Sequence, residues 1–211
     1  IVNLYNKHDA VERAAWGLED KQPEAVIQRF DRMHFYAYPE RGDHRAAPAP
    51  VRPSFRVAAL VGQAKDSESE AVATLRSMGH LPAERGDAEV AERVEEAKRW
   101  LAAYAPDSKL RIELNRTVPE DLVITAAERA VFAELAVHLR THLDGPEALS
   151  ESEFKTRIFD ALRSRDLPPR PFFQLAYQAL LGREDGPAMS PFLLSMGEKV
   201  LPLLDQAAGG N

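Results

Sequence analysis

Three motifs of the same form mark the starts of helices along this chain. They are Ser67-x-x-Glu70, Thr125-x-x-Glu128 and Ser150-x-x-Glu153. In such a capping box the hydroxyl of the first residue accepts a hydrogen bond from the backbone N–H of the fourth, and the carboxylate of the fourth accepts one from the N–H of the first. Apolar residues at helical spacing follow each motif. The sequence therefore predicts a fold made of successive, individually capped helices.

Apolar residues at helical spacing predict further helices between and beyond these motifs. The expected helical ranges from residue 54 onward are 54–65, 67–78, 87–105, 125–143, 150–162, 172–182 and 190–208. In the last range, Ser190 is expected to cap the helix with Pro191 as its first residue, and Pro202 is expected to kink it.

One short stretch alternates instead of following the helical period. Leu110, Ile112 and Leu114 indicate an extended segment, and no second strand is evident to pair with it. We expect about seven or eight helices and no sheet, which corresponds to an all-α multi-helix bundle or α-helix cage.

The first fifty residues have a different character. Residues 1–17 show helical periodicity that stops at a glycine, and the aromatic run in 24–38 is expected to form an extended or packed connector. Residues 39–53 are rich in proline, alanine and charge and indicate a linker. We therefore divide the chain into residues 1–52 and a domain of residues 53–211. Because it starts without methionine and directly in a helical pattern, we interpret it as a piece of a larger protein.

Composition excludes several classes of function. The chain has no cysteine, so it has no disulfide, thiolate nucleophile or zinc–thiolate site, and the cytoplasm is its expected location. A net charge of −6 argues against a protein coated with positive charge, as a general nucleic-acid condenser would be. No apolar run approaches the roughly 20 residues of a membrane span. Phosphate-binding and hydrolase signatures are missing too, so no catalytic residue is expected.

Two histidines have the spacing of a helical metal pair. His138 and His142 are four residues apart, which places them on one face of the helix expected over 125–143. No third ligand is evident, and no glutamate follows His138 to act as a general base. We therefore expect these histidines on a helix surface or interface, without a bound metal, and keep a helical metalloenzyme only as an alternative.

Positive charge is concentrated between residues 155 and 183. This stretch has a net charge of +4 within a chain of −6. Its cationic residues are Lys155, Arg157, Arg163, Arg165, Arg170 and Arg183. A polyanion would be steered to such a patch and repelled elsewhere, which suits recognition of a defined nucleic-acid feature.

Aromatic residues accompany these arginines at a proline-rich corner. Phe172 and Phe173 directly follow the segment from Leu167 to Pro171. Arginine can pair with phosphate or stack on a base, and an aromatic ring can hold an unstacked base. The alternative is that the two rings are core anchors and the arginines only solvate the surface. We expect a core role for at least one ring, because adjacent residues on a helix do not share a face.

Five segments follow one another in a characteristic order. They are PSFRVAALVGQAK, KRWLAAYAP, ESEFKTRIFDALRSRDL, PFFQLAYQALLGREDGP and SPFLLSMGEKVL. This order resembles the C-terminal half of class I lysyl-tRNA synthetases over roughly residues 53–208, and residues 1–38 look like the tail of the connecting domain of that family. The resemblance implies an α-helix cage that binds the tRNA anticodon. The turn ending in Gly186-Pro187 is also similar to the anticodon-binding region of glutamyl-tRNA synthetases, the main competing family.

The resemblance implies a parent enzyme that uses ATP, with Mg²⁺, to attach lysine to its tRNA. The HIGH and KMSKS signatures that bind ATP in the family are absent, so this chain alone is expected neither to aminoacylate nor to hold a cofactor. Its implied partners are a tRNA anticodon stem-loop and the catalytic domain of the same polypeptide, with no membrane. The family pattern continues Gly-Pro-Arg, whereas Ala188 follows Pro187 here, so no role of that arginine transfers.

The expected RNA contacts fall into groups by chemistry. Phosphate contacts or stacking are expected from Arg163, Arg165, Arg170 and Arg183. Base stacking or edge recognition is expected from Phe172, Gln174 and Tyr177, while Trp100 and Tyr104 are weaker candidates expected in the core. The residues expected to shape a turn without touching RNA are Gly182, Gly186 and Pro187. The alternative from another class is an acidic helical protein-interaction domain that takes a basic partner and has no RNA role.

Overall fold

The computed structural model describes residues 53–81, 86–104, 111–144 and 148–209, and isolated positions at 9, 10, 25, 28, 29, 32 and 33. Its helices are α3 (Phe55–Ala64), α4 (Glu68–Ser77), α5 (Asp87–Tyr104), α6 (Ala126–Asp144), α7 (Glu151–Arg163), α8 (Pro169–Leu181), α9 (Met189–Met196), the 3₁₀ helix η3 (Gly197–Val200) and α10 (Leu201–Ala207). No strand occurs in the described ranges, and the predicted all-α fold is confirmed.

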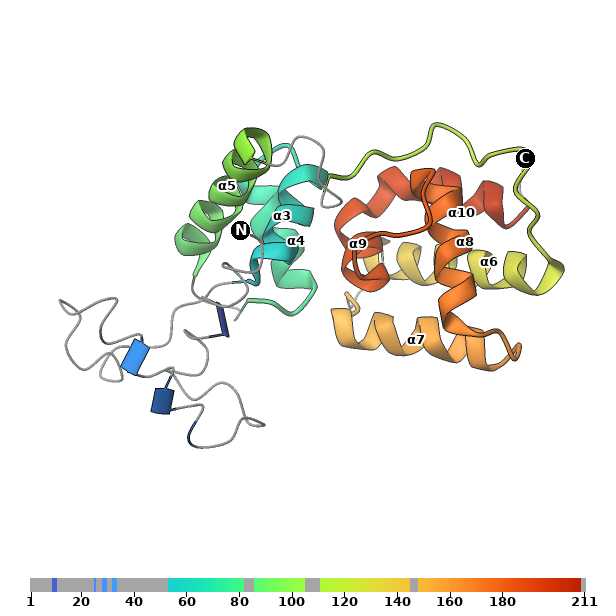
Figure 1. The fold of residues 1–211 in the computed structure, drawn as a ribbon, viewed down its shortest axis with the longest axis horizontal. Coiled ribbons are helices and arrows are strands. Elements are labelled where there is room, and N and C mark those ends of the chain that lie inside the picture. The colour runs from blue at the N-terminus through green and yellow to red at the C-terminus, as the bar shows by residue number, and fades with distance from the viewer. Residues whose placement is uncertain are drawn as a thin grey trace.

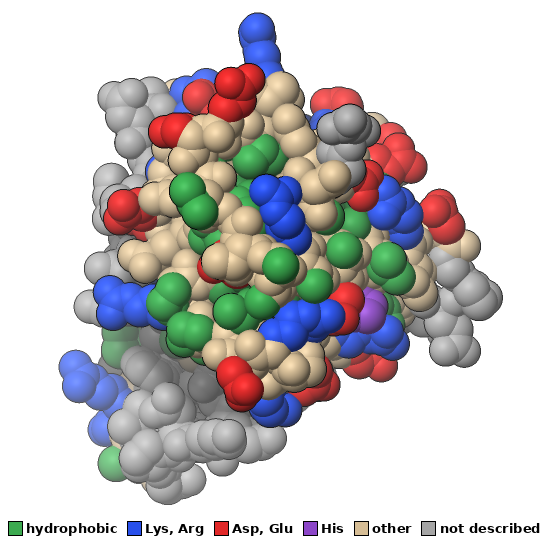
Figure 2. Space-filling view, turned by 90° about the vertical axis from the view of Figure 1, so that its right-hand side faces the viewer, with side chains coloured by type: hydrophobic (Ala, Val, Ile, Leu, Met, Phe, Trp, Pro, Cys, Tyr) green, Lys and Arg blue, Asp and Glu red, His purple; other side chains and the backbone are tan. Residues whose placement is uncertain are grey.

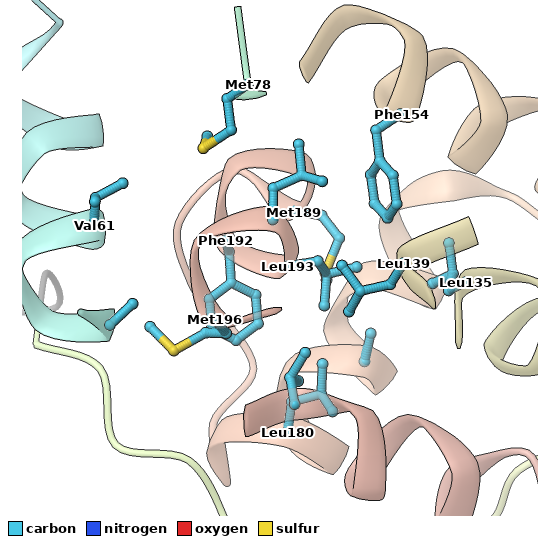
Figure 3. Close-up of a cluster of buried hydrophobic side chains, with 14 of the residues drawn as sticks. Val61, Met78, Leu135, Leu139, Phe154, Leu180, Met189, Phe192, Leu193 and Met196 are labelled. Atoms are coloured by element: carbon cyan, nitrogen blue, oxygen red, sulfur yellow. The ribbon is translucent and has the colours of Figure 1, made fainter. Parts of the chain in front are cut away.

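The helices form two groups that share one core (Figure 1). Helices α3, α4 and α5 pack together at one end, α6, α7, α8 and α10 at the other, and α9 contacts both groups. All residues of α9 are buried. In Figure 3, Phe192 and Met196 of α9 lie toward Val61 of α3, while Leu193 lies beside Leu139 of α6. A helix that is apolar all round needs neighbours on every side, so α9 joins the two groups into one core.

All three predicted capping boxes are formed. The pairs are Ser67 with Glu70, Thr125 with Glu128 and Ser150 with Glu153. In each pair the hydroxyl oxygen of the first residue accepts a hydrogen bond from the backbone N–H of the glutamate, at 3.2 or 3.3 Å. The glutamate carboxylate accepts a hydrogen bond from the backbone N–H of the first residue. These hydrogen bonds lower the pKa of the Glu70 and Glu153 carboxyls. The predicted starts of α4, α6 and α7 are therefore confirmed.

An extended segment, residues 111–124, connects the two groups of helices (Figure 1). The backbone N–H of Ile112 donates to Oε1 of Gln63 in α3 at 2.9 Å. The backbone N–H of Val118 donates to Oε1 of Gln206 in α10 at 2.8 Å. Side-chain amides of the helices thus take hydrogen bonds that a neighbouring strand would otherwise accept, which is why an extended segment is stable here without a sheet.

The C-terminal stretch differs from the single kinked helix predicted for it. Helix α9 begins at Met189, so Ser190 lies inside the helix and does not cap it. The 3₁₀ helix then interrupts the α-helix, and Pro202 stands in the first turn of α10, where its missing N–H is not needed. The prediction that Ser190 caps this helix is therefore wrong, and the kink expected at Pro202 is found as a break in the α-helix directly before that proline.

Few positions before residue 53 are described. Those between 24 and 38 are residues 25, 28, 29, 32 and 33, which are helical and exposed, so the extended or packed connector is not seen at these positions, and the aromatic residues of the run lie outside the described part of the chain. The predicted helix over 1–17 is described only at residues 9 and 10, which are helical, and the linker over 39–53 lies outside the described residues except for Pro53. Asp9 accepts a hydrogen bond from the N–H of Phe55 at 3.0 Å and pairs with Arg93 of α5.

Candidate nucleic-acid interface

Helices α7 and α8 meet in a tight turn at one end of the molecule (Figure 1). The N–H of Leu167 donates to the carbonyl of Leu162 at 3.0 Å, and the N–H of Asp166 donates to that of Arg163 at 3.2 Å. These are the two hydrogen bonds of a Schellman motif. Asp166 adopts the left-handed backbone conformation that this motif requires, with φ of 52°. Pro169 stands at the start of α8, where proline is compatible with the helix, so the turn is firmly defined on both sides.

Two of the predicted arginines at this corner extend into solvent. The side chain of Arg163 is 76% exposed and pairs with Asp160, one turn earlier, at 2.9 Å. Arg170, in the first turn of α8, is exposed and forms no ion pair within the described ranges. Arg165 differs, because its side chain is only 25% exposed and its guanidinium bridges Glu134 of α6 and a carbonyl of α7. Arg163 and Arg170 are thus open to a polyanion, whereas Arg165 ties the turn to α6.

The two adjacent phenylalanines divide between core and surface. Phe172 is 1% exposed and packs on Phe132 of α6 with ring centroids 5.2 Å apart. Its ring has no face open to a base, which corrects the assignment of Phe172 to base stacking. Phe173 is half-buried and meets Phe159 of α7 edge to face, with centroids 5.9 Å apart. The partly exposed pair at this corner is therefore Phe159 and Phe173; sequence reasoning considered Phe173 but selected Phe172 for base stacking, and it did not consider Phe159.

Further cations extend the basic surface along α7. Lys155 and Arg157 are both exposed on this helix. Partial burial, and then the charge of Arg157, lower the pKa of His138 on the neighbouring α6. Figure 2 shows the end of the molecule on which the α7–α8 turn lies, where Lys and Arg side chains are interspersed with hydrophobic ones.

Tyr177 is a structural part of the turn that follows α8. Its hydroxyl donates a hydrogen bond to the carbonyl of Pro187, and burial raises its pKa to about 12. Gly186 lies against the ring so closely that a Cβ there would be 2.6 Å from two ring carbons. The ring is 9% exposed, so it is covered by the turn and offers no stacking surface, contrary to the role expected of Tyr177.

The C-terminus of α8 is capped from a distant segment. The Nδ2 group of Asn115 donates to the carbonyls of Gln178 at 3.0 Å and Ala179 at 2.9 Å, and its backbone N–H donates to that of Leu180 at 2.8 Å. Gly182 ends the helix with φ of 66°, and a Cβ on it would lie 3.0 Å from Oδ1 of Asn115. The glycine could be recognised from sequence, but nothing local identifies Asn115 as its partner.

The remaining predicted RNA-binding residues lie at opposite ends of α8. Gln174 is half-buried one turn after Arg170, on the same side of the helix. Arg183 is half-buried in the turn after α8, near the hydroxyl of Tyr177. Thirteen residues of α8 separate the two ends, which is roughly 20 Å along the axis. The structure thus brings Arg163, Arg170 and Gln174 to one corner and separates Arg183 from them.

The two histidines considered as metal ligands have different surroundings. His142 is buried, with Nε2 3.5 Å from the hydroxyl of Ser77 on α4. His138 is half-buried, and its pKa is lowered by this burial and by the charge of Arg157, while the charge of Glu134 opposes the shift. In the part of the chain that the structure describes, no group of three or more potential metal ligands occurs.

One cavity could hold a small molecule. It measures about 340 Å³ and lies between α3, α5 and the start of the extended segment. Its two cations are each paired with a glutamate, Lys98 with Glu95 at 2.8 Å and Arg111 with Glu113 at 3.5 Å. The cavity therefore carries little net charge that would attract a phosphate group.

Trp100 is buried and meets Phe55 edge to face at 5.4 Å, which confirms its expected core position. The side chain of Tyr104 lies outside the described part of the chain. None of the helices in the described ranges is both long and apolar enough to cross a membrane.

No family model matches this chain, but curated proteins are similar to it, and the three cited below share one name. The lysine–tRNA ligase of Thermococcus kodakarensis is 30% identical over 202 residues, which are 94% of this chain and 37% of that enzyme. The lysine–tRNA ligase of Pyrococcus horikoshii is 28% identical over 93% of this chain and 36% of that enzyme, and that of Borreliella burgdorferi is 20% identical over 93% of this chain. The chain spans little more than a third of the length of these relatives. It is a lysine–tRNA ligase-related region, similar over nearly its whole length to one part of these enzymes.

Proposed function

We propose that this chain is the anticodon-binding α-helix cage of a class I lysyl-tRNA synthetase, with residues 53–211 forming the cage and residues 1–52 belonging to the connecting domain. The parent enzyme attaches lysine to its tRNA with ATP and Mg²⁺ in the cytoplasm. This part contributes tRNA binding and no catalytic group. Similarity to lysine–tRNA ligases over 94% of the chain supports the proposal, and the relatives cited above carry that name rather than the glutamyl one.

The observation that carries an RNA-binding role is the position of Arg163 and Arg170 on the two sides of one turn. Both side chains are exposed, and the turn between them is fixed by hydrogen bonds and proline. A guanidinium can pair with a phosphate through two parallel hydrogen bonds. Asp160, the partner of Arg163, is itself exposed, and exposed ion pairs are weak, so a phosphate can displace it.

Arg165 supports the site without being its main phosphate contact. A phosphate would have to compete with Glu134 for this guanidinium. The bridge fixes the turn against α6, so that Arg163 and Arg170 keep their spacing. Gln174 lies beside these cations and carries an amide, which can donate to or accept from the edge of an unpaired base.

Binding to an RNA hairpin tests the proposal. The whole chain is titrated with the anticodon stem-loop of a lysine tRNA and with the same hairpin in which the central anticodon uridine is replaced by cytidine. We expect tighter binding to the uridine hairpin and a steep fall in affinity as salt rises, because each neutralised phosphate releases counterions. Equal binding to both hairpins would remove anticodon reading from the proposal.

Charge reversal supplies the matched control. The double variant Arg163→Glu and Arg170→Glu is expected to lose most of the binding. Arg56→Glu changes an exposed arginine on α3, in the other group of helices, and is expected to bind like the wild type. Absence of binding by the wild-type chain even at low salt would overturn the proposal and favour an acidic protein-interaction domain.

A further inference from the structure

We propose that Phe159 and Phe173 form a platform on which one unpaired base of the bound RNA stacks. This inference rests on the RNA-binding function proposed above and assigns the base contact to two residues of the same corner. Both rings are half-buried, they come from different helices, and their planes are nearly perpendicular, at 84°, with centroids 5.9 Å apart. The pair therefore places two partly exposed aromatic rings from different helices next to each other at the corner.

The position of the platform is set from the core. Phe172 is buried against Phe132 and also meets Phe173, with ring centroids 6.1 Å apart. On α7, Phe159 stands between Ile158, which is buried, and Asp160, which is exposed. The way in which α7 and α8 are rotated about their axes therefore determines where the two rings lie. A base that stacks on a ring already fixed in this way does not have to order it first.

Cations stand one helical turn from each ring. Residues three or four apart on a helix are neighbours on its surface, with Cβ atoms about 5–6 Å apart. Arg163 and Lys155 each lie four residues from Phe159, and Arg170 lies three residues from Phe173. A nucleotide can therefore place its phosphate on a cation and its base on the adjacent ring. Phe159 has a cation on either side along α7, and Phe173 adds a second ring and a cation from α8, which is why we assign the pair and not a single residue.

The platform selects for unpaired RNA. Bases in a duplex are stacked and paired, so their faces are closed to a side chain, whereas bases in a loop can be splayed out onto an aromatic ring. Stacking tolerates any base, because every base has a flat face. The platform therefore contributes affinity for a loop, and discrimination between bases is left to hydrogen-bonding groups such as the amide of Gln174 beside it.

A thermodynamic cycle between protein and RNA tests the platform. Each loop nucleotide of the hairpin is replaced in turn by an abasic one, and binding is measured for the wild-type chain and for Phe159→Leu and Phe173→Leu. In the wild type, one abasic position is expected to weaken binding by about 10-fold. The same abasic substitution is expected to weaken hairpin binding by less than about 2-fold in either leucine variant, because the stacking partner of that base is already missing.

Phe154→Leu is the matched control, since it makes the same substitution on α7 at a ring that is buried in the core. It is expected to lower the melting temperature but to keep the full abasic penalty. If the wild type binds the hairpin and both leucine variants keep that penalty, the platform is wrong and the RNA-binding function stands. If the wild type does not bind the hairpin at low salt, both are overturned.

Discussion

The side chain of Asn115 closes the C-terminal end of α8 and occupies the space that a Cβ on Gly182, the residue at which that helix ends, would enter. The last carbonyls of a helix have no partner within it and need donors from elsewhere. Asn115 supplies them from the extended segment that connects the two groups of helices. The helix whose first turn carries Arg170 is therefore anchored at its other end by a residue far away in sequence.

Replacing Asn115 tests this anchor. Asn115→Ala removes two side-chain hydrogen bonds and is expected to lower the free energy of unfolding by about 1–2 kcal/mol. Asn115→Asp should lower the free energy of unfolding further, because a carboxylate donates no hydrogen bond and is repelled by the negative end of the helix dipole. Urea denaturation of the three proteins measures the differences. Equal stability of Asn115→Ala and the wild type would contradict the capping role.

A side chain at position 186 should open the turn after α8. Gly186→Ala places a Cβ 2.6 Å from two ring carbons of Tyr177, so the ring or the turn has to move. We expect a loss of about 1–3 kcal/mol in unfolding free energy, the usual cost of overpacking. Glu184→Ala, at an exposed position of the same turn, should stay within about 0.5 kcal/mol of the wild type. A result in which the two variants are equally stable would show that the contact is not constraining.

Alkaline titration should reveal Tyr177. Its pKa in the folded protein is raised to about 12, above the ordinary value of 10.0. A raised pKa means that its contribution to stability is complete below pH 10 and is lost as pH rises from about 10 to about 12. Absorbance at an ultraviolet wavelength specific for tyrosinate should show a late ionisation step for Tyr177, and Tyr177→Phe should remove that step. Ionisation of all tyrosines near pH 10 in the folded chain would contradict this.

Mild acid should weaken the junction between α4 and α6. Burial and the nearby charge of Lys65 lower the pKa of His142 below its ordinary value of 6.5. The unfolded chain then binds a proton more readily than the folded one, so stability is complete above about pH 6.5 and falls as pH drops below it. Urea midpoints at pH 7.5 and pH 5.5 should differ less for His142→Gln than for the wild type. An unchanged difference would assign the acid sensitivity to other groups.

Asp166 should limit both stability and RNA affinity. It occupies a left-handed backbone conformation between the two exposed arginines of the corner. Asp166→Gly is expected to raise the unfolding free energy by up to about 1 kcal/mol, because glycine adopts this conformation freely. Asp166→Asn removes only the charge and should tighten hairpin binding by about 2- to 5-fold at low salt. Weaker binding by Asp166→Asn would mean that the carboxylate itself contributes to recognition.

Sequence reasoning succeeded where the signal is local. A capping box involves four consecutive residues, so the starts of α4, α6 and α7 could be read directly. The end of α8 at Gly182 was equally clear. In α9 the signal is missing, since a helix buried on every side has no amphipathic pattern to mark where it begins or breaks.

The candidate site depended on contacts that no local pattern contains. Sequence spacing showed that Phe172 and Phe173 could not share a face, but which of them faces outward depends on how α8 packs on Phe132. The burial of Tyr177 follows from the turn that folds back over its ring. Arginines at the corner were identified by charge alone, yet charge could not show that Arg165 is held by Glu134.

The buried helix α9 also limits how this protein can be divided. Because its side chains fill the space between the two groups of helices, cutting the chain in the extended segment would leave α9 with one flank exposed to water. A fragment that starts after residue 110 would carry every arginine of the corner and still lack α3, one of the helices that pack on α9. The corner that we propose to bind RNA is therefore not a transplantable module, because its stability depends on α3 and α5, which carry no part of the corner itself.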